Sequence, residues 1–99
     1  MSVVKRQPTA DDDLFEIWSY IAKDSIREAD KLIRKISETF LLLADNPRMG
    51  SRREELAESL RAFPVKSYVI YYRPHDRKEG IVVVRVLNAN QNITESHFE

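Results

Sequence analysis

The chain has 99 residues, its 16 basic and 16 acidic side chains give a formal net charge of zero, and it has no cysteine. These counts exclude a disulfide framework and a thiolate metal site, and they lack the strong basic excess of a dedicated nucleic-acid binder. The length fits one domain over residues 1–99. Without a signal-peptide core or an apolar run of about 18 residues, we expect a cytoplasmic protein with no membrane contact.

The start of the chain predicts one strand and one helix. Residues 2–7 combine a β-prone valine pair with basic residues and are followed by Pro8, which is typical of a short strand at a sheet edge. Thr9 is in position to cap the helix, and Asp12 completes a capping-box pattern. We expect the helix to end near Asp24, and its apolar residues recur at helical spacing: Leu14, Ile17, Trp18 and Ile21.

The run of acids from Asp11 to Asp13 falls in the first turn of this helix. Negative charge is favourable there because of the helix dipole, and adjacent acids on a helix point in different directions. We therefore interpret the run as a solvated first turn and not as a metal or acid-base cluster.

A second helix should follow almost directly. Ser25 and Glu28 repeat the capping pattern, and the helix should stop at Asp45-Asn46-Pro47. Its apolar stripe consists of Ala29, Leu32, Ile33, Ile36, Phe40 and Leu43. Because the linker is so short, we expect an antiparallel helical hairpin with Trp18 as a core anchor. The alternative for Trp18 is a partner-binding hot spot.

The second half of the chain predicts a connector and three strands. Residues 47–59 indicate a turn at Met49-Gly50 and then a solvated, charged connector with one helical turn around residues 54–57. Three β-prone runs follow, at 60–65, 68–73 and 81–87, and the polar residues from Pro74 to Gly80 favour an antiparallel hairpin. The predicted fold is α+β in the order β-α-α-β-β-β, with a helical hairpin packed on a small, mainly antiparallel, twisted sheet.

Strict alternation assigns faces to the last two strands. In the final strand it places Val82, Val84 and Val86 opposite Ile81, Val83, Arg85 and Leu87. In the strand before it, Tyr68, Ile70 and Tyr72 should oppose Val69, Tyr71 and Arg73. Both faces are apolar, so these should be central strands that need cover from the helices.

Several segments in this order resemble the ParE branch of the RelE/ParE toxin superfamily. They are Asp13–Ala22, Asn46–Gly50, Leu60–Val65, Tyr68–Pro74 and Val84–Leu87. The resemblance implies the toxin of a bacterial type II toxin-antitoxin module, which inhibits DNA gyrase by protein binding. It further implies a ParD-like antitoxin that wraps and neutralises the toxin as a hetero-oligomer. It implies no cofactor, no metal, no catalytic residue and no direct sequence-specific nucleic-acid binding.

Two alternatives remain within the superfamily. RelE-type members cut messenger RNA on the ribosome, which requires convergent basic side chains. Here Val69 and Gln91 stand where those enzymes have arginines, and His97 is the only basic residue after Arg85. An inactive homologue that only binds antitoxin is the other alternative, because Asn88 to Asn92 replace an ionic segment found in many ParE-like chains.

The candidate antitoxin- or target-binding residues lie mostly on the predicted strands: Trp18, Arg61, Phe63, Tyr71, Arg73 and Arg85. If the three arginines share a face opposite the helices, they would form a basic patch suited to an acidic antitoxin segment. Otherwise we expect them to form surface salt bridges with nearby acids, namely Glu54, Glu55, Glu58 and Asp76.

Overall fold

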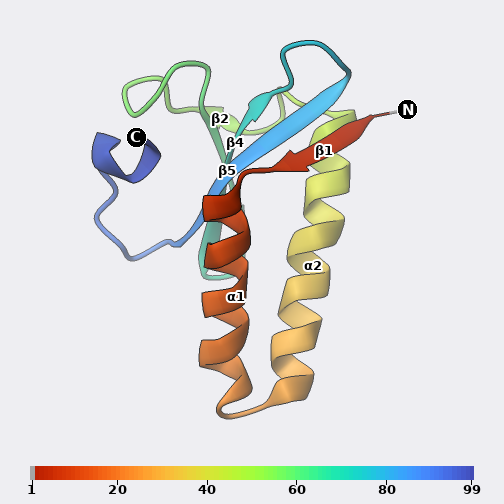
Figure 1. Ribbon diagram of the computed structural model, residues 1–99, viewed down its shortest axis with the longest axis vertical. Coiled ribbons are helices and arrows are strands. Elements are labelled where there is room, and N and C mark those ends of the chain that lie inside the picture. The colour runs from red at the N-terminus through yellow and green to blue at the C-terminus, as the bar shows by residue number, and fades with distance from the viewer. Residues whose placement is uncertain (1) are drawn as a thin grey trace.

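A helical hairpin packs on one face of a five-stranded sheet in the computed structural model, which describes residues 2–99 (Figure 1). The elements are β1 (Val3–Arg6), α1 (Pro8–Ala22), α2 (Ile26–Asp45), β2 (Ser51–Arg52), β3 (Arg61–Val65), β4 (Tyr68–Pro74), β5 (Gly80–Asn88) and the short 3-10 helix η1 (Glu95–Phe98). The strand order is β1-β5-β4-β3-β2; β1 runs parallel to β5 and all other neighbours are antiparallel. The predicted α+β class is confirmed, with β2 as an unpredicted additional strand.

The edge position predicted for β1 is also confirmed, and one glycine makes the pairing feasible. Gly80 lies opposite Val3 and has a φ of +134°, a backbone conformation that L side chains rarely adopt. A Cβ at this position would lie 1.9 Å from the Val3 carbonyl oxygen. Glycine therefore lets β5 begin in direct contact with the first strand.

The start of α1 differs from the prediction. Proline occupies the first helical position, where no backbone N–H is needed, and Gln7 is the N-cap without a side-chain bond. The Thr9 hydroxyl instead donates to the Val84 carbonyl oxygen at 3.0 Å, so the proposed capping box with Asp12 does not form. The helix ends at Ala22, slightly before the predicted Asp24. The cap of α2 is confirmed, because the Ser25 hydroxyl accepts from Glu28 N at 3.1 Å.

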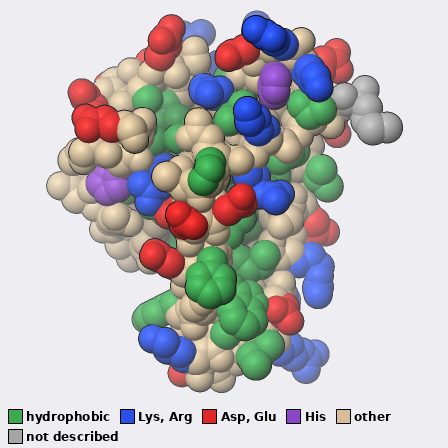
Figure 2. Space-filling view, viewed as in Figure 1, with side chains coloured by type: hydrophobic (Ala, Val, Ile, Leu, Met, Phe, Trp, Pro, Cys, Tyr) green, Lys and Arg blue, Asp and Glu red, His purple; other side chains and the backbone are tan. Residues whose placement is uncertain are grey.

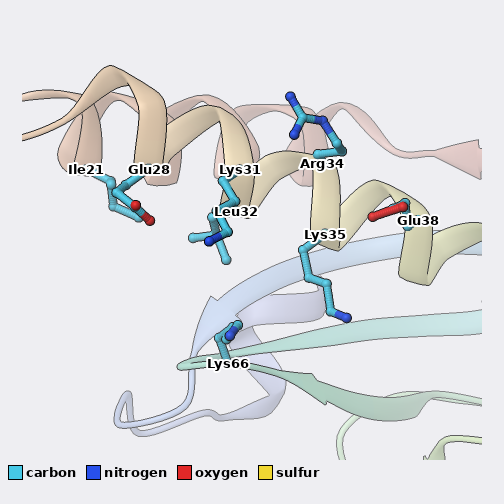
Figure 3. Close-up of a pocket in the computed structure, with 8 residues that line it drawn as sticks. All are labelled: Ile21, Glu28, Lys31, Leu32, Arg34, Lys35, Glu38 and Lys66. Atoms are coloured by element: carbon cyan, nitrogen blue, oxygen red, sulfur yellow. The ribbon is translucent and has the colours of Figure 1, made fainter.

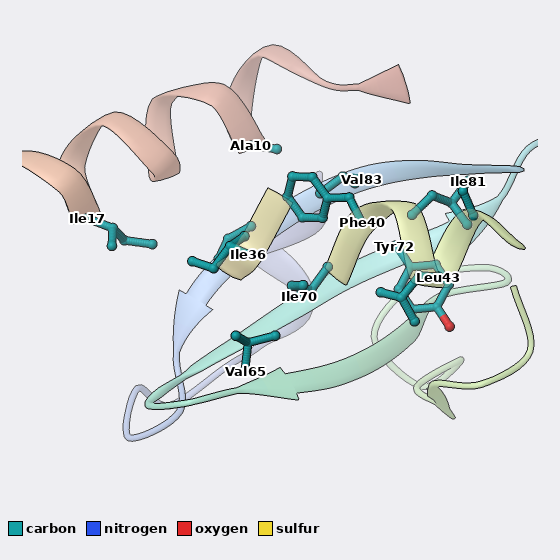
Figure 4. Packing of buried hydrophobic residues seen from close by; sticks show 12 residues of the cluster. Ala10, Ile17, Ile36, Phe40, Leu43, Val65, Ile70, Tyr72, Ile81 and Val83 are labelled. Carbon is teal, nitrogen blue, oxygen red and sulfur yellow. The ribbon is translucent and has the colours of Figure 1, made fainter. Parts of the chain in front are cut away.

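The main core lies between the hairpin and the sheet (Figure 4). The predicted stripe of α2 points into it, with Ile36, Phe40 and Leu43 almost completely buried. From the sheet come Val65, Ile70, Tyr72, Ile81, Val83 and Val86. Burying each large apolar side chain stabilises the fold by about 1.5 to 3 kcal/mol, so the hairpin provides the cover that one face of the sheet requires.

Strict alternation in β5 is wrong beyond Val83, because the strand contains a bulge. Tyr72 pairs with Val83 and Tyr71 with Arg85, which leaves Val84 without a partner on β4. An extra residue in one strand moves every following side chain of that strand to the opposite face of the sheet. Val83 and Val86 consequently both belong to the main core, whereas Val84 and Leu87 face away from the helices.

The sheet face away from the helices is covered by two irregular segments. Leu60, Ala62, Tyr71, Val84 and Leu87 form a second cluster there, and Leu56, Ala57, Ile93 and Phe98 pack against it from the connector and the C-terminal segment. The Phe98 ring meets the Tyr71 ring edge-on, with centroids 5.1 Å apart. The connector is therefore not merely solvated, and its residues 54–56 form a turn in place of the predicted helical one.

Candidate protein-interaction site

The three arginines of the predicted basic patch do not share a face. Arg61 pairs with Tyr72, whose ring is in the main core, so Arg61 lies on the helix-facing side of the sheet. Arg85 pairs with Tyr71, and Arg73 follows Tyr71 by two positions, which places both on the opposite side. The patch that the sequence suggested is thus divided between two faces.

Arg85 is held inside the protein by Asp13. Its Nε and Nη2 donate to the two Asp13 carboxylate oxygens, each at 2.8 Å, and its Nη1 donates to the His97 carbonyl oxygen at 3.0 Å. Asp13 is buried, although the sequence suggested a solvated position, and it also accepts from Val86 N at 3.0 Å. Hydrogen bonding to Asp13 raises the pKa of Arg85 above its ordinary value, although burial lowers it. The pair links α1, β5 and the C-terminal segment.

Tyr71 and Arg73 are covered by the chain itself. Tyr71 is buried beneath Phe98, and the Nη1 atom of Arg73 is buried with no hydrogen-bond partner among the described residues. Arg53 lies on the same side and pairs with Glu55 at 2.8 Å. This pairing raises the pKa of Arg53, with a smaller contribution from Tyr71. Tyr71 belongs to the second cluster, and the two arginines are half-buried.

Arg61 and Phe63 also have internal roles. Arg61 Nη1 donates to the carbonyl oxygens of Gly50 at 2.7 Å and Arg48 at 3.2 Å, and it makes none of the predicted salt bridges. Phe63 is half-buried against the main core. Arg61 therefore holds the turn that follows α2, and Phe63 contributes to packing.

Trp18 is not the core anchor that its helical spacing suggested. It is half-buried, and its Nε1 donates to Asp30 Oδ1 of α2 at 2.8 Å. The indole thus bridges α1 and α2. Trp18 therefore lies outside the main core, and its role in binding a partner stays a prediction.

Two exposed apolar side chains lie one helical turn from the residues of the Trp18–Asp30 bond, and sequence reasoning missed them. Phe15 is 69% exposed and precedes Trp18 by one helical turn, and Ile26 is 61% exposed one turn before Asp30. We name these four residues, Phe15, Trp18, Ile26 and Asp30, the hairpin face. The turn between the helices lies beyond the ends of the strands, and hydrophobic side chains gather over this end of the molecule (Figures 1 and 2). Phe15 and Ile26 do not belong to the residues that pack in the main core, which explains their exposure.

A groove runs along the other side of α2, between this helix and the turn joining β3 to β4 (Figure 3). Its volume is about 560 Å³. Ile21 and Leu32 contribute apolar surface, Lys66 lies across the groove from α2, and the remaining lining residues are Glu28, Lys31, Arg34, Lys35 and Glu38. Four basic and two acidic side chains make the groove suited to an acidic, amphipathic segment of another protein.

His97 has a structural position near the end of the chain. Its Nδ1 accepts from Thr94 N at 3.1 Å, which completes a capping box around η1, and Gln91 Nε2 lies 3.2 Å from its Nε2. Val69 is half-buried in the second cluster. With Arg85 bound to Asp13, these positions do not form the convergent basic group that RNA cleavage requires.

Residues 2–99 contain neither a metal-ligand cluster nor a membrane-spanning helix. No group of three or more histidine, cysteine, aspartate or glutamate side chains is arranged to hold a metal ion. Neither helix of this region has the length and hydropathy needed to cross a membrane.

Comparisons with known proteins identify relatives over nearly the whole chain. Residues 4–93 match the family model described as the ParE toxin of the type II toxin-antitoxin system parDE. Toxin ParE3 of Caulobacter vibrioides is 27% identical over 92 residues, which covers 92% of this chain and 89% of the relative. Toxin ParE1 of the same organism is 31% identical over 81 residues, which covers 81% of this chain and 81% of the relative.

Two solved structures share the fold. The chromosomal ParDE system from P. aeruginosa contains a chain with a TM-score of 0.73 at 19% identity, covering 91% of this chain and 98% of that one. The toxin-antitoxin complex RelBE2 from Mycobacterium tuberculosis contains a chain with a TM-score of 0.59 at 22% identity. The match covers 90% of this chain and 93% of that one. Both are similar in the arrangement of the helical hairpin and the sheet.

Proposed function

Because the chain belongs to the ParE toxin family of type II toxin-antitoxin systems, we propose that it inhibits DNA gyrase by protein binding and is neutralised by a ParD-like antitoxin. The hairpin face is the observation that carries this proposal. Phe15 of α1 and Ile26 at the start of α2 are both mostly exposed. Contiguous exposed apolar surface in a soluble protein is typical of a site that binds another protein.

The composition of the hairpin face fits a protein partner. Aromatic side chains dominate the energy of protein interfaces because they bury a large area with few rotatable bonds. Trp18 is held in place by Asp30, so little conformational entropy is lost when a partner covers it. We propose that the antitoxin covers this face and extends into the groove of α2, where the basic rim favours acidic side chains.

Protein binding is favoured over RNA cleavage by the engagement of the basic residues. A ribonuclease of this fold would need free cations around the scissile phosphate. Arg85 is fixed by a two-point contact with Asp13, and the His97 ring is bonded to the backbone of Thr94. All three nitrogen atoms of the Arg85 guanidinium are thus engaged, as is Nδ1 of His97. We therefore propose a toxin that acts without catalysis in the cytoplasm.

A gyrase assay tests the proposal. Purified chain is added to gyrase, ATP and relaxed plasmid, with and without the antitoxin encoded beside it, and the products are examined for supercoiling and for trapped linear DNA. We expect less supercoiling and more linear DNA, both reversed by antitoxin. Undisturbed supercoiling by a folded chain that binds antitoxin would reject gyrase as the target. Cleaved messenger RNA after induction would instead indicate RelE-type activity.

A further inference from the structure

Two arginines lie opposite each other on β2 and β3, the two strands at one edge of the sheet. Arg52 of β2 and Arg61 of β3 are direct partners in the antiparallel register, so their side chains emerge on the same face. Like charges in this arrangement destabilise a sheet. Among residues 2–99, no carboxylate oxygen lies within 4.0 Å of either guanidinium. The fold thus places two cations side by side without neutralising them.

Both arginines line a cavity of about 200 Å³, together with Glu54, Ser59, Leu60 and Pro74. Arg61 is fixed there because its Nη1 donates to the carbonyl oxygens of Gly50 and Arg48. Arg52 makes no side-chain hydrogen bond within the described region, so all its donors are available. Ser59 has a φ of +59°, an uncommon conformation for a residue other than glycine. Such strain is often found where a backbone is shaped around a ligand.

We propose that this cavity, the Arg52–Arg61 pocket, binds one carboxylate group of an antitoxin segment. The proposal rests on the proposed function for the existence of that partner. A guanidinium group presents parallel N–H donors that match the two oxygens of a carboxylate. The two arginines and Glu54 give the lining a charge of one positive unit, which a single carboxylate would neutralise.

The surroundings of the pocket favour a carboxylate over a nucleic-acid backbone. Nucleic acids bind through several phosphate contacts at once, which requires an extended basic surface. The connector beside the pocket carries Glu54, Glu55 and Glu58, which would repel neighbouring phosphates. A single acidic side chain or terminal carboxylate meets less of this repulsion than a polyanionic backbone because it brings only one negative charge.

The first experiment uses the full chain without antitoxin. Nuclear magnetic resonance follows the Nε–H signals of Arg52 and Arg61 while sodium acetate replaces sodium chloride at constant ionic strength. We expect saturable shifts of both signals in the wild type and loss of the Arg61 shift in Arg52→Gln. No saturable shift would overturn the proposal. Stronger binding of dimethyl phosphate than of acetate would also overturn it and would assign the pocket to a nucleic-acid backbone.

The second experiment measures the affinity of the chain for its antitoxin by calorimetry. We expect Arg52→Gln to weaken binding about ten- to a hundredfold, as for a lost charge-assisted hydrogen-bond pair. Lys5→Gln removes the same charge at the opposite edge of the sheet and should leave affinity within about twofold. Equal affinities of wild type and Arg52→Gln would overturn the proposal. If the wild-type chain binds no antitoxin, the proposed function fails, and the acetate titration still decides whether the pocket binds a carboxylate.

Discussion

Asp13 and Arg85, 72 residues apart in the chain, form a two-point ion pair that closes the edge of the sheet beside α1. β1 pairs with β5 only as far as Val83. Beyond that point Thr9 bonds to the Val84 carbonyl oxygen and Asp13 to the Val86 N–H. The first turns of α1 thus continue the hydrogen bonding of the missing edge strand with side chains, and Arg85 neutralises the buried carboxylate.

Replacing Asp13 by Asn should therefore destabilise the fold by about 2 to 4 kcal/mol, measured by urea unfolding. The substitution leaves the Arg85 guanidinium, whose side chain is only 23% exposed, without a counter-ion. Asp11→Asn is the matched control, because Asp11 pairs with Arg6 at a site where both side chains are about half exposed. It should cost at most about 1 kcal/mol. Equal effects of the two substitutions would show that the Asp13 pair is no stronger than a surface pair.

A second prediction concerns the Tyr72 hydroxyl, which joins the sheet to the turn after α2. It accepts from Gly50 N at 2.8 Å and donates to the Pro47 carbonyl oxygen at 2.9 Å. Tyr72→Phe removes both bonds and leaves two backbone groups unpaired, so we expect a loss of about 1 to 3 kcal/mol in the free energy of unfolding. Tyr68→Phe, at a half-buried tyrosine of the same strand, is the control and should cost less.

The same tyrosine should make the fold sensitive to alkaline pH. Burial raises the pKa of Tyr72 above its ordinary value of about 10. The folded state therefore keeps the phenolic proton at a pH where the unfolded state releases it, and the free energy of unfolding falls as the pH rises above about 10. Urea unfolding between pH 8 and pH 11, as an approximate range, should show a shallower decline for Tyr72→Phe than for the wild type. Parallel declines would contradict this assignment.

The order and type of the main elements were predictable because local signals agreed with the tertiary fold. The α2 stripe, the Ser25 cap and the three strand runs each reflect the environment that the element meets in the structure. The sequence could not predict which side chains of β5 point to which face of the sheet. The bulge lies at Val84, and no residue in this run of valines signals a bulge. The cap at Thr9 failed because a backbone carbonyl from β5, remote in sequence, competes for its hydroxyl.

The site was less predictable than the fold because strand arginines can point to either face and can find internal partners. Arg85 is bound to Asp13, whose burial no local pattern indicates. The exposure of Phe15 and Ile26 did have a signal, since both fall outside the apolar stripes of their helices. Their significance emerges only from the structure, in which no other part of the chain covers them.

A further prediction is that Arg73→Met stabilises the protein. The Nη1 atom of Arg73 is buried without a hydrogen-bond partner among the described residues, and an unpaired buried donor costs about 1 to 3 kcal/mol. Methionine retains an unbranched apolar stem and removes the unpaired group. We expect the melting temperature to rise by about 4 °C or more, in keeping with a gain of about 1 kcal/mol in a domain of this size. A lower melting temperature would indicate that the other guanidinium atoms make stabilising contacts with water.

The last prediction separates binding from folding at the hairpin face. Phe15→Ser combined with Ile26→Ser removes two exposed apolar side chains that no other part of the chain covers. Because exposed substitutions rarely change stability by more than about 0.5 kcal/mol each, urea unfolding should differ little from that of the wild type. Affinity for the antitoxin should fall at least about tenfold, since the variant loses an aromatic contact at the centre of the proposed interface. Met49→Ser, at an exposed apolar residue beyond the other end of α2, is the control and should bind normally. If the double variant and the control bind the antitoxin equally well, the hairpin face is not the antitoxin site, and its exposed aromatic residues would then be available to contact the target.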